Sequence, residues 1–168
     1  MIRVQYALAA LALAVAACST PGSETPPPQA AASVVPAEIA AATSVAAPGI
    51  AITSGERDAD GNEYEVTGTM PNGDEIELDL VQSNGAWRVM EIQRDVAWSS
   101  VPDPVRVAAG AAPSSFEPVR VIESKQPADG SVIFELFAAE GQDGGPGRGP
   151  SMEVRWHDGK AAVISPAR

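Results

Sequence analysis

Few side chains in this chain of 168 residues belong to the types that commonly carry chemistry. Cys18 is the only cysteine and His157 is the only histidine. One thiol and one imidazole cannot supply the nitrogen and sulfur ligands of a tetrahedral zinc site. His157 stands beside an Asp-Gly pair, so we expect a solvated turn residue there and not a general base. The sequence predicts no metal and no cofactor.

Carboxylates are the remaining candidates for chemistry. Glu65, Glu77 and Asp79 occupy alternate positions of two predicted strands, so they are expected to gather on one face of a sheet. Paired carboxylates can serve as general acid and base, but a solvated strand face accounts for the same pattern. The segment DADGNE at 58–63 lacks the spacing and the closing glutamate of an EF-hand and is interpreted as a turn. We therefore predict no catalytic residue, and a small acid-dependent hydrolase is the least favoured alternative.

Cys18 directly follows a segment with the layout of an export signal. Arg3 precedes an apolar run from Tyr6 to Ala17, as in a secretory signal peptide. The run is too short to cross a ~30 Å hydrocarbon core comfortably, which disfavours a transmembrane anchor. The residues VAAC at 15–18 resemble the lipobox of bacterial lipoproteins. We accordingly expect residues 1–17 to be a lipoprotein signal peptide and Cys18 to be the site of lipid attachment; an ordinary signal peptide cut nearby is the alternative.

The composition after Cys18 predicts a tether and an envelope location. Residues 18–33 are rich in Pro and Ala and carry one charge, which is typical of a disordered linker. By resemblance to Gram-negative lipoproteins, Ser19 implies sorting to the outer membrane, with the folded part facing the periplasm. The formal net charge of −11 and the lack of a basic run argue against binding to nucleic acid. Membrane contact is expected through the N-terminal lipid only.

The rest of the chain is interpreted as two copies of one unit, at 34–97 and 98–168. VPAEIAAATSVAAPGI begins the first copy at Val35, and VPDPVRVAAGAAPSSF begins the second at Val101. YEV at 64–66 corresponds to FEL at 134–136, and IELDL at 76–80 corresponds to MEVRW at 152–156. NGAWRV and DGKAAV close the two units. The shared order of these segments indicates a tandem repeat.

Each copy is expected to begin with a helix and to continue with strands. Pro36 and Pro102 suit the first turn of a helix. Ile76, Leu78 and Leu80 alternate with carboxylates, as in a half-buried strand, and Asn-Gly and Asp-Gly pairs mark hairpin turns. We predict an α+β fold of two tandem α-β-β-β units, each an N-terminal helix packed on the apolar face of a small antiparallel sheet. The pattern does not decide whether the two units share one continuous sheet.

The order of these motifs resembles the PepSY family and its relatives. The resemblance rests on the Ala-rich helix beginning at Val-Pro, the Pro-Gly stop, the Asp-Gly turn before YEV and the polar hairpin that closes on DGK, and it extends from Val35 to Ile164 as two copies. The second copy departs from it in the insert at 138–151 and in Phe134, which stands in place of the tyrosine. Such modules occur in exported proteins and protease propeptides. The resemblance therefore implies binding or restraint of a peptidase, without catalytic residues.

The expected function is accordingly non-catalytic. We predict a lipid-anchored envelope protein that binds a protein partner, an envelope peptidase or another periplasmic protein, through sheet faces or edge strands. Trp98 lies between the two copies, where packing between the copies is expected; as the alternative, an exposed anchor, it is the candidate partner contact. A structural envelope lipoprotein without a specific ligand is the competing hypothesis. The sequence identifies neither the partner nor the oligomeric state.

Overall fold

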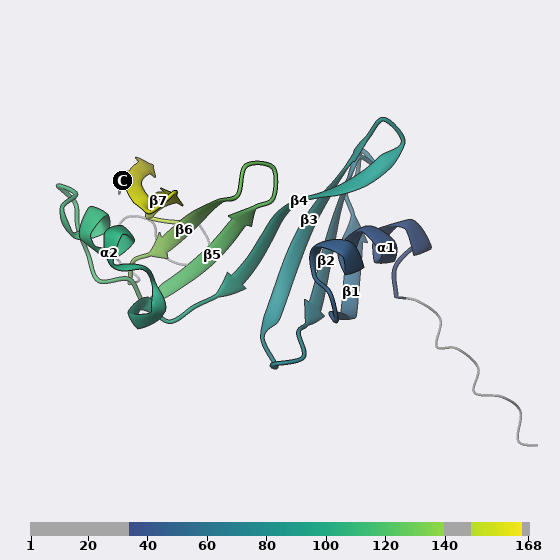
Figure 1. Cartoon of the computed structure of the whole chain (residues 1–168), viewed down its shortest axis with the longest axis horizontal. Helices are drawn as coiled ribbons and strands as arrows, with labels where there is room; N and C mark the ends of the chain where they lie inside the picture. The colour runs from purple at the N-terminus through teal and green to yellow at the C-terminus, as the bar shows by residue number, and fades with distance from the viewer. Residues whose placement is uncertain (1–33, 140–148, 166–168) are drawn as a thin grey trace, which may run out of the picture. The chain divides into compact units, whose positions relative to one another are not determined.

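The computed structural model describes residues 34–139 and 149–165. The predicted signal peptide (1–17), the predicted tether (18–33), Cys18 and most of the insert in the second copy lie outside the described residues. The helical elements are α1 (Ala37–Ala46), the 3-10 turn η1 (Trp98–Ser100) and α2 (Asp103–Gly110) (Figure 1). The strands are β1 (Ala51–Arg57), β2 (Glu63–Thr69), β3 (Glu75–Ser83), β4 (Ala86–Asp95), β5 (Arg120–Gln126), β6 (Ser131–Phe137), β7 (Met152–His157) and β8 (Lys160–Ser165).

All eight strands belong to one antiparallel sheet, in which each strand pairs with its neighbours in the sequence. The predicted fold of two tandem α-β-β-β units, each with its own small sheet, is therefore wrong. The segments that were expected only to close the two units contain the starts of additional strands, β4 and β8. β4 then pairs directly with β5, from Ile92 opposite Lys125 to Asp95 opposite Ile122. This pairing joins the two halves in one ladder.

Polar contacts on both faces stabilise the junction between β4 and β5. On one face, Arg94 lies 2.6 Å from Glu123 and 3.1 Å from Asp74. On the other face, Arg120 donates hydrogen bonds of 2.7 and 3.0 Å to the two carboxylate oxygens of Asp95. Pairing also satisfies main-chain groups of β4 that would otherwise form an unpaired sheet edge. The continuous sheet thus depends on contacts between residues 25 and 29 positions apart.

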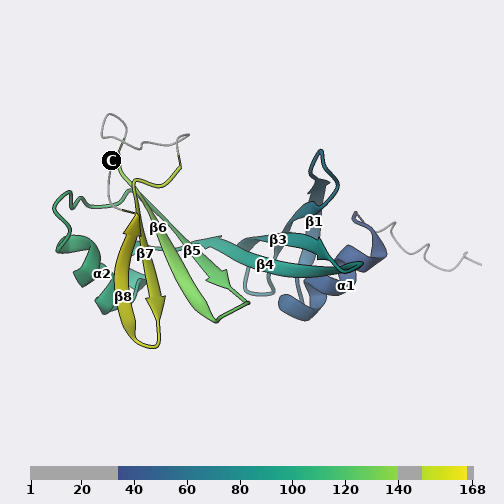
Figure 2. The same ribbon diagram turned by 90° about the horizontal axis from the view of Figure 1, so that it is seen from above.

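Both helices cover the same face of the sheet. Residues that lie directly opposite one another on neighbouring strands point to one face. The pairing gives one such row across β3 to β6, formed by Leu78, Ile92, Lys125 and Val132. Leu78 packs in one hydrophobic cluster with Ile39 of α1, and Val132 packs in another with Val105 of α2. Figures 1 and 2 show each helix against strands of its own half. We call this side of the sheet the helix face and the opposite side the open face.

The first hydrophobic cluster shows why the helix packs closely on these strands. Ile39 of α1 and Leu78 of β3 are fully buried. The alternation of apolar residues in the sequence predicted the burial of Leu78. The rings of Tyr64 and Trp87 meet edge to face, with centroids 6.1 Å apart. Val35, just before α1, packs onto Gly55 of β1, where a Cβ atom would overlap it and would lie 2.8 Å from Tyr64 Cε1. Position 55 therefore requires glycine for the approach of the N-terminal segment.

Candidate functional site

A row of four carboxylates crosses the open face of β1 to β4. The register places Glu56 opposite Glu65, Glu65 opposite Asp79, and Asp79 opposite Glu91. We call these four residues the acidic row. None of them forms an ion pair within the described part of the chain. Glu91 accepts hydrogen bonds from the Ser124 hydroxyl and, at 3.1 Å, from Gln126 Nε2 across the junction of β4 and β5. Like charges in direct opposition destabilise a sheet, so packing and strand pairing do not explain the other three carboxylates of the row.

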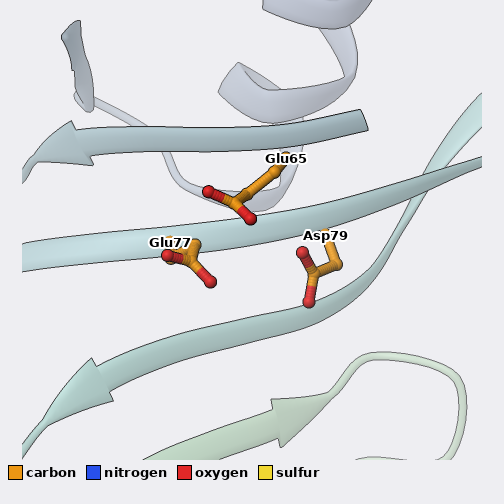
Figure 3. Close-up of side chains that lie close together, drawn as sticks. All are labelled: Glu65, Glu77 and Asp79. Carbon is orange, nitrogen blue, oxygen red and sulfur yellow. The ribbon is translucent and has the colours of Figure 1, made fainter. Parts of the chain in front are cut away.

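Glu77 adds a further carboxylate beside the acidic row. One carboxylate oxygen each from Glu65, Glu77 and Asp79 lies within 4.8 Å of the others, and Figure 3 shows the three side chains together over β2 and β3. The prediction that these three residues share one face is confirmed. Three carboxylates supply only part of the about six to eight oxygens that Ca²⁺ takes. Their arrangement is better suited to attracting a cationic group that brings its own hydrogen bonds.

Burial and repulsion by neighbouring carboxylates raise the pKa of three carboxyl groups on the open face, those of Glu77, Asp79 and Glu135. The pKa of Asp79 is raised first by burial and then by the charges of Glu91 and Glu65. Burial also comes first among the causes that raise the pKa of Glu77, followed by Glu65 and Asp79. On β6, burial and then the charge of Glu91 raise the pKa of Glu135. The negative potential of the open face therefore extends across the junction of β4 and β5.

The acidic row borders a cleft of about 480 Å³. The carboxylates lining it are Glu56, Asp58, Glu63, Glu65, Asp79 and Glu91. A bulge in β4, where Leu80 pairs with Val89 but Asp79 pairs with Glu91, leaves Met90 without a cross-strand partner. The Met90 side chain is 40% exposed and also lines the cleft. Carboxylates together with an exposed methionine suit a segment that carries both cationic and apolar groups.

Among residues 34–139 and 149–165, β1 and β8 are the two edges of the sheet, and each pairs with a described neighbour on one side only. Edge strands present unpaired main-chain N–H and C=O groups unless they are blocked by proline, lysine or a cover. β1 reads AITSGER and contains neither proline nor lysine. α2 lies against β7 and β8, whereas α1 lies against β4. The outer edge of β1 thus belongs to a seven-residue strand that has a bulge around Thr53, is contacted by Val35 at Gly55 and adjoins the acidic row.

Several residues singled out in the sequence lie away from this cleft. His157 ends β7, with its Nε2 atom 3.4 Å from Asp158, and lies next to the exposed turn that the Asp-Gly pair predicted. Trp98 begins η1, is partly buried and packs against the second hydrophobic cluster. The segment at 58–63 forms the turn between β1 and β2, where the Glu63 N–H donates to Asp58 at 2.9 Å. Cys18 lies outside the described residues, so lipid attachment there stays a prediction.

Among the residues that line the cleft, Glu56, Met90 and Glu91 were not singled out from the sequence. Glu91 and Met90 were missed because β4 was not predicted as a strand. The alternation of Glu91, Gln93 and Asp95 would have indicated one polar face of such a strand. Glu56 could be placed opposite Glu65 only from the strand register, because the bulge around Thr53 shifts the pairing of β1.

No protein-family model matches this chain, and no curated protein matches it either. The PepSY resemblance therefore stays a prediction. None of the helices in the described ranges is long and apolar enough to cross a membrane.

Proposed function

We propose that this chain is a non-catalytic, lipid-anchored envelope protein that binds a protein partner by adding an extended segment of that partner to its sheet. The single observation that carries the proposal is the outer edge of β1, which has no partner strand among the described residues and lies beside the open face. Strand addition gives affinity through main-chain hydrogen bonds and needs no special side chains at the edge. Ala51, Ser54 and Gly55 are small and fit that requirement, because they leave the main chain accessible.

The energetics of strand addition are adequate for a specific complex. In an edge strand of seven residues, about half of the residues direct their N–H and C=O groups outward, which gives roughly six hydrogen bonds. Each contributes about 0.5–1.5 kcal/mol net, and ordering of the partner segment offsets part of the total. Side-chain contacts must therefore add affinity and select the partner.

A peptidase of the cell envelope is the partner class that the PepSY resemblance implies. The chain would restrain or regulate it and would contribute no catalytic group. A structural lipoprotein without a specific ligand is the competing hypothesis. The acidic row disfavours it, because like charges in direct opposition destabilise a sheet and a purely structural face gains nothing from them.

Site-specific photocrosslinking in cells tests this function. A photoreactive residue replaces Ser54 on β1 in one variant and Ala162 on β8 in another, and the control replaces Val45 of α1, which is 83% exposed. We expect one discrete, saturable adduct from the β1 position and none from Val45, with mass spectrometry identifying the protein held. The same mixture of abundant envelope proteins from all three positions would support the structural alternative. An adduct from Ala162 alone would assign the binding to β8.

A further inference from the structure

We propose that the outer edge of β1 selects an extended segment whose lysine or arginine side chains lie on the open face, at every second position, with one of them opposite Glu56 at the end of the acidic row. The inference rests on the proposed function and names the chemistry of the partner. It combines two observations: the unpaired edge of β1 and the unneutralised carboxylates on one side of it. The occupant is a segment of another protein.

The register of β1 determines which positions of the added strand face the carboxylates. Glu56 points to the open face, because it lies opposite Glu65. A residue directly opposite Glu56 on an added strand would have its Cβ atom about 4.5–5.5 Å away. Glu65 lies one strand further in, about 10 Å from the added strand. A long cationic side chain opposite Glu56 therefore approaches both carboxylates.

The other face of β1 disfavours a cation. Arg57 lies opposite Tyr64 on the helix face. Its guanidinium lies 5.8 Å from the Tyr64 ring centroid and 5.1 Å from that of Trp87. A second cation on that face would be repelled by Arg57 and would find no carboxylate row. Because successive side chains of a strand alternate between faces, the site selects cations at a period of two and not cationic charge in general.

Charge also excludes two other occupants of the edge. The segment at 18–33 of this chain contains Glu24 and neither lysine nor arginine, so it offers no cation to the row. A second molecule of this protein would pair its β1 with β1 of the first, and each molecule carries a formal net charge of −11. Pairing of two such edges brings acidic surfaces together, which electrostatic repulsion opposes. A basic segment of a partner relieves the repulsion within the row instead.

A set of fluorescein-labelled peptides tests the inference with the full chain in mild detergent. The first peptide has seven residues and alternates lysine with threonine. The second has the same composition with its lysines in one block, and the third has glutamine in place of lysine. Two further versions of the first peptide carry N-methyl groups, one on its odd-numbered amides and the other on its even-numbered amides. N-methylation removes the N–H donors along one edge of the added strand. Fluorescence anisotropy measures each affinity at low and at high salt.

We expect the alternating lysine peptide to bind about tenfold more tightly than the block isomer or the glutamine peptide at low salt. High salt should reduce this advantage, since exposed charges are screened. Glu56→Gln combined with Glu65→Gln should lose about the same factor. The charge-matched control combines Glu38→Gln on α1 with Glu117→Gln before β5, both exposed and outside the cleft, and should bind like the unmodified chain. One of the two N-methylated peptides should lose binding.

Each of the other possible outcomes would refute one part of the proposal or the whole of it. Equal binding of the lysine and glutamine peptides would refute selection by charge and leave strand addition standing. Equal binding of the alternating and block isomers would refute the period of two. If both N-methylated peptides bind like their parent, strand addition itself is refuted and the carboxylates act as a diffuse anionic surface. Absence of binding by every peptide, or dimerisation of the chain through β1, would overturn the inference as a whole.

Discussion

Neutralising the central carboxylate of the acidic row should stabilise the protein. Asp79 lies directly opposite both Glu65 and Glu91, so Asp79→Asn removes two like-charge oppositions at once. Opposed pairs of this kind are worth about 0.2–1 kcal/mol each, and we therefore expect the free energy of unfolding to rise by about 1 kcal/mol at neutral pH. For a folded region of this size, that corresponds to an increase in Tm of about 3–5 °C. Urea unfolding followed by tryptophan fluorescence measures the change.

The pH dependence of the same variant gives an independent check. The pKa of Asp79 is raised above its ordinary value of 3.8 by burial and by Glu91 and Glu65. The stability that such a group contributes is present below its unfolded pKa and is lost as the pH rises through its folded pKa. The unmodified chain should therefore gain stability on acidification from neutral pH, and Asp79→Asn should gain less. Below about pH 4 the trend reverses, because the pKa of Asp58 is lowered by its hydrogen bond from the Glu63 N–H.

Asp103→Asn is the matched control for Asp79→Asn. Asp103, in the first turn of α2, pairs with Arg106, and both side chains are exposed. Its neutralisation should lower the free energy of unfolding by about 0.3–0.5 kcal/mol, the ordinary contribution of such a helical pair. Loss of stability in Asp79→Asn, or an unchanged pH slope, would refute the reasoning. Either result would mean that the Asp79 carboxylate has a favourable partner that offsets the charges of its neighbours.

Four further substitutions test the packing. Leu78→Ala removes a fully buried side chain of the first cluster and should cost about 3 kcal/mol in urea unfolding; a loss below about 1 kcal/mol would contradict the described core. Gly55→Ala should cost about 1–3 kcal/mol because its Cβ atom would meet Val35, whereas Gly110→Ala, with open space around it, should be neutral or slightly stabilising. Trp98→Ala should lower the free energy of unfolding by about 2 kcal/mol, since the ring is only partly buried against the second cluster. Unchanged melting and unchanged partner capture in Trp98→Ala would remove Trp98 from both roles.

The local elements of the fold could be predicted from the sequence because their signals are short in range. The proline at the start of each helix and the alternation of Ile76, Leu78 and Leu80 placed α1, α2 and β3. The same alternation put Glu65, Glu77 and Asp79 on one face, which the strand register confirms. These patterns need only the periods of a helix or a strand, so no tertiary information is required.

The continuous sheet could not be predicted in the same way. It depends on the pairing of β4 with β5 and on contacts such as Arg94 with Glu123 and Arg120 with Asp95, which join residues 29 and 25 positions apart. Nothing in the local pattern of either strand specifies that partner. The repeat in the sequence left open whether the two copies share one sheet, because each copy contained enough alternation to bury a helix on its own strands.

The acidic row was only partly visible in the sequence for a related reason. Opposition of Glu56 with Glu65 and of Asp79 with Glu91 is a property of the register and of the bulges in β1 and β4. A shift of one residue would send each of these side chains to the helix face. The sequence therefore indicated the carboxylates of β2 and β3 but not the row that extends to the free edge.

Hydrogen exchange of the full chain, with and without the alternating lysine peptide, tests the central claim most directly. Amides of β1 that point away from β2 have no partner strand among the described residues, so they should exchange rapidly in the free chain. If the peptide adds as a further strand, these amides should become protected, while the outer amides of β8 should not change. Protection confined to β8, or binding without any new protection in β1, would contradict the claim that this edge is the binding site.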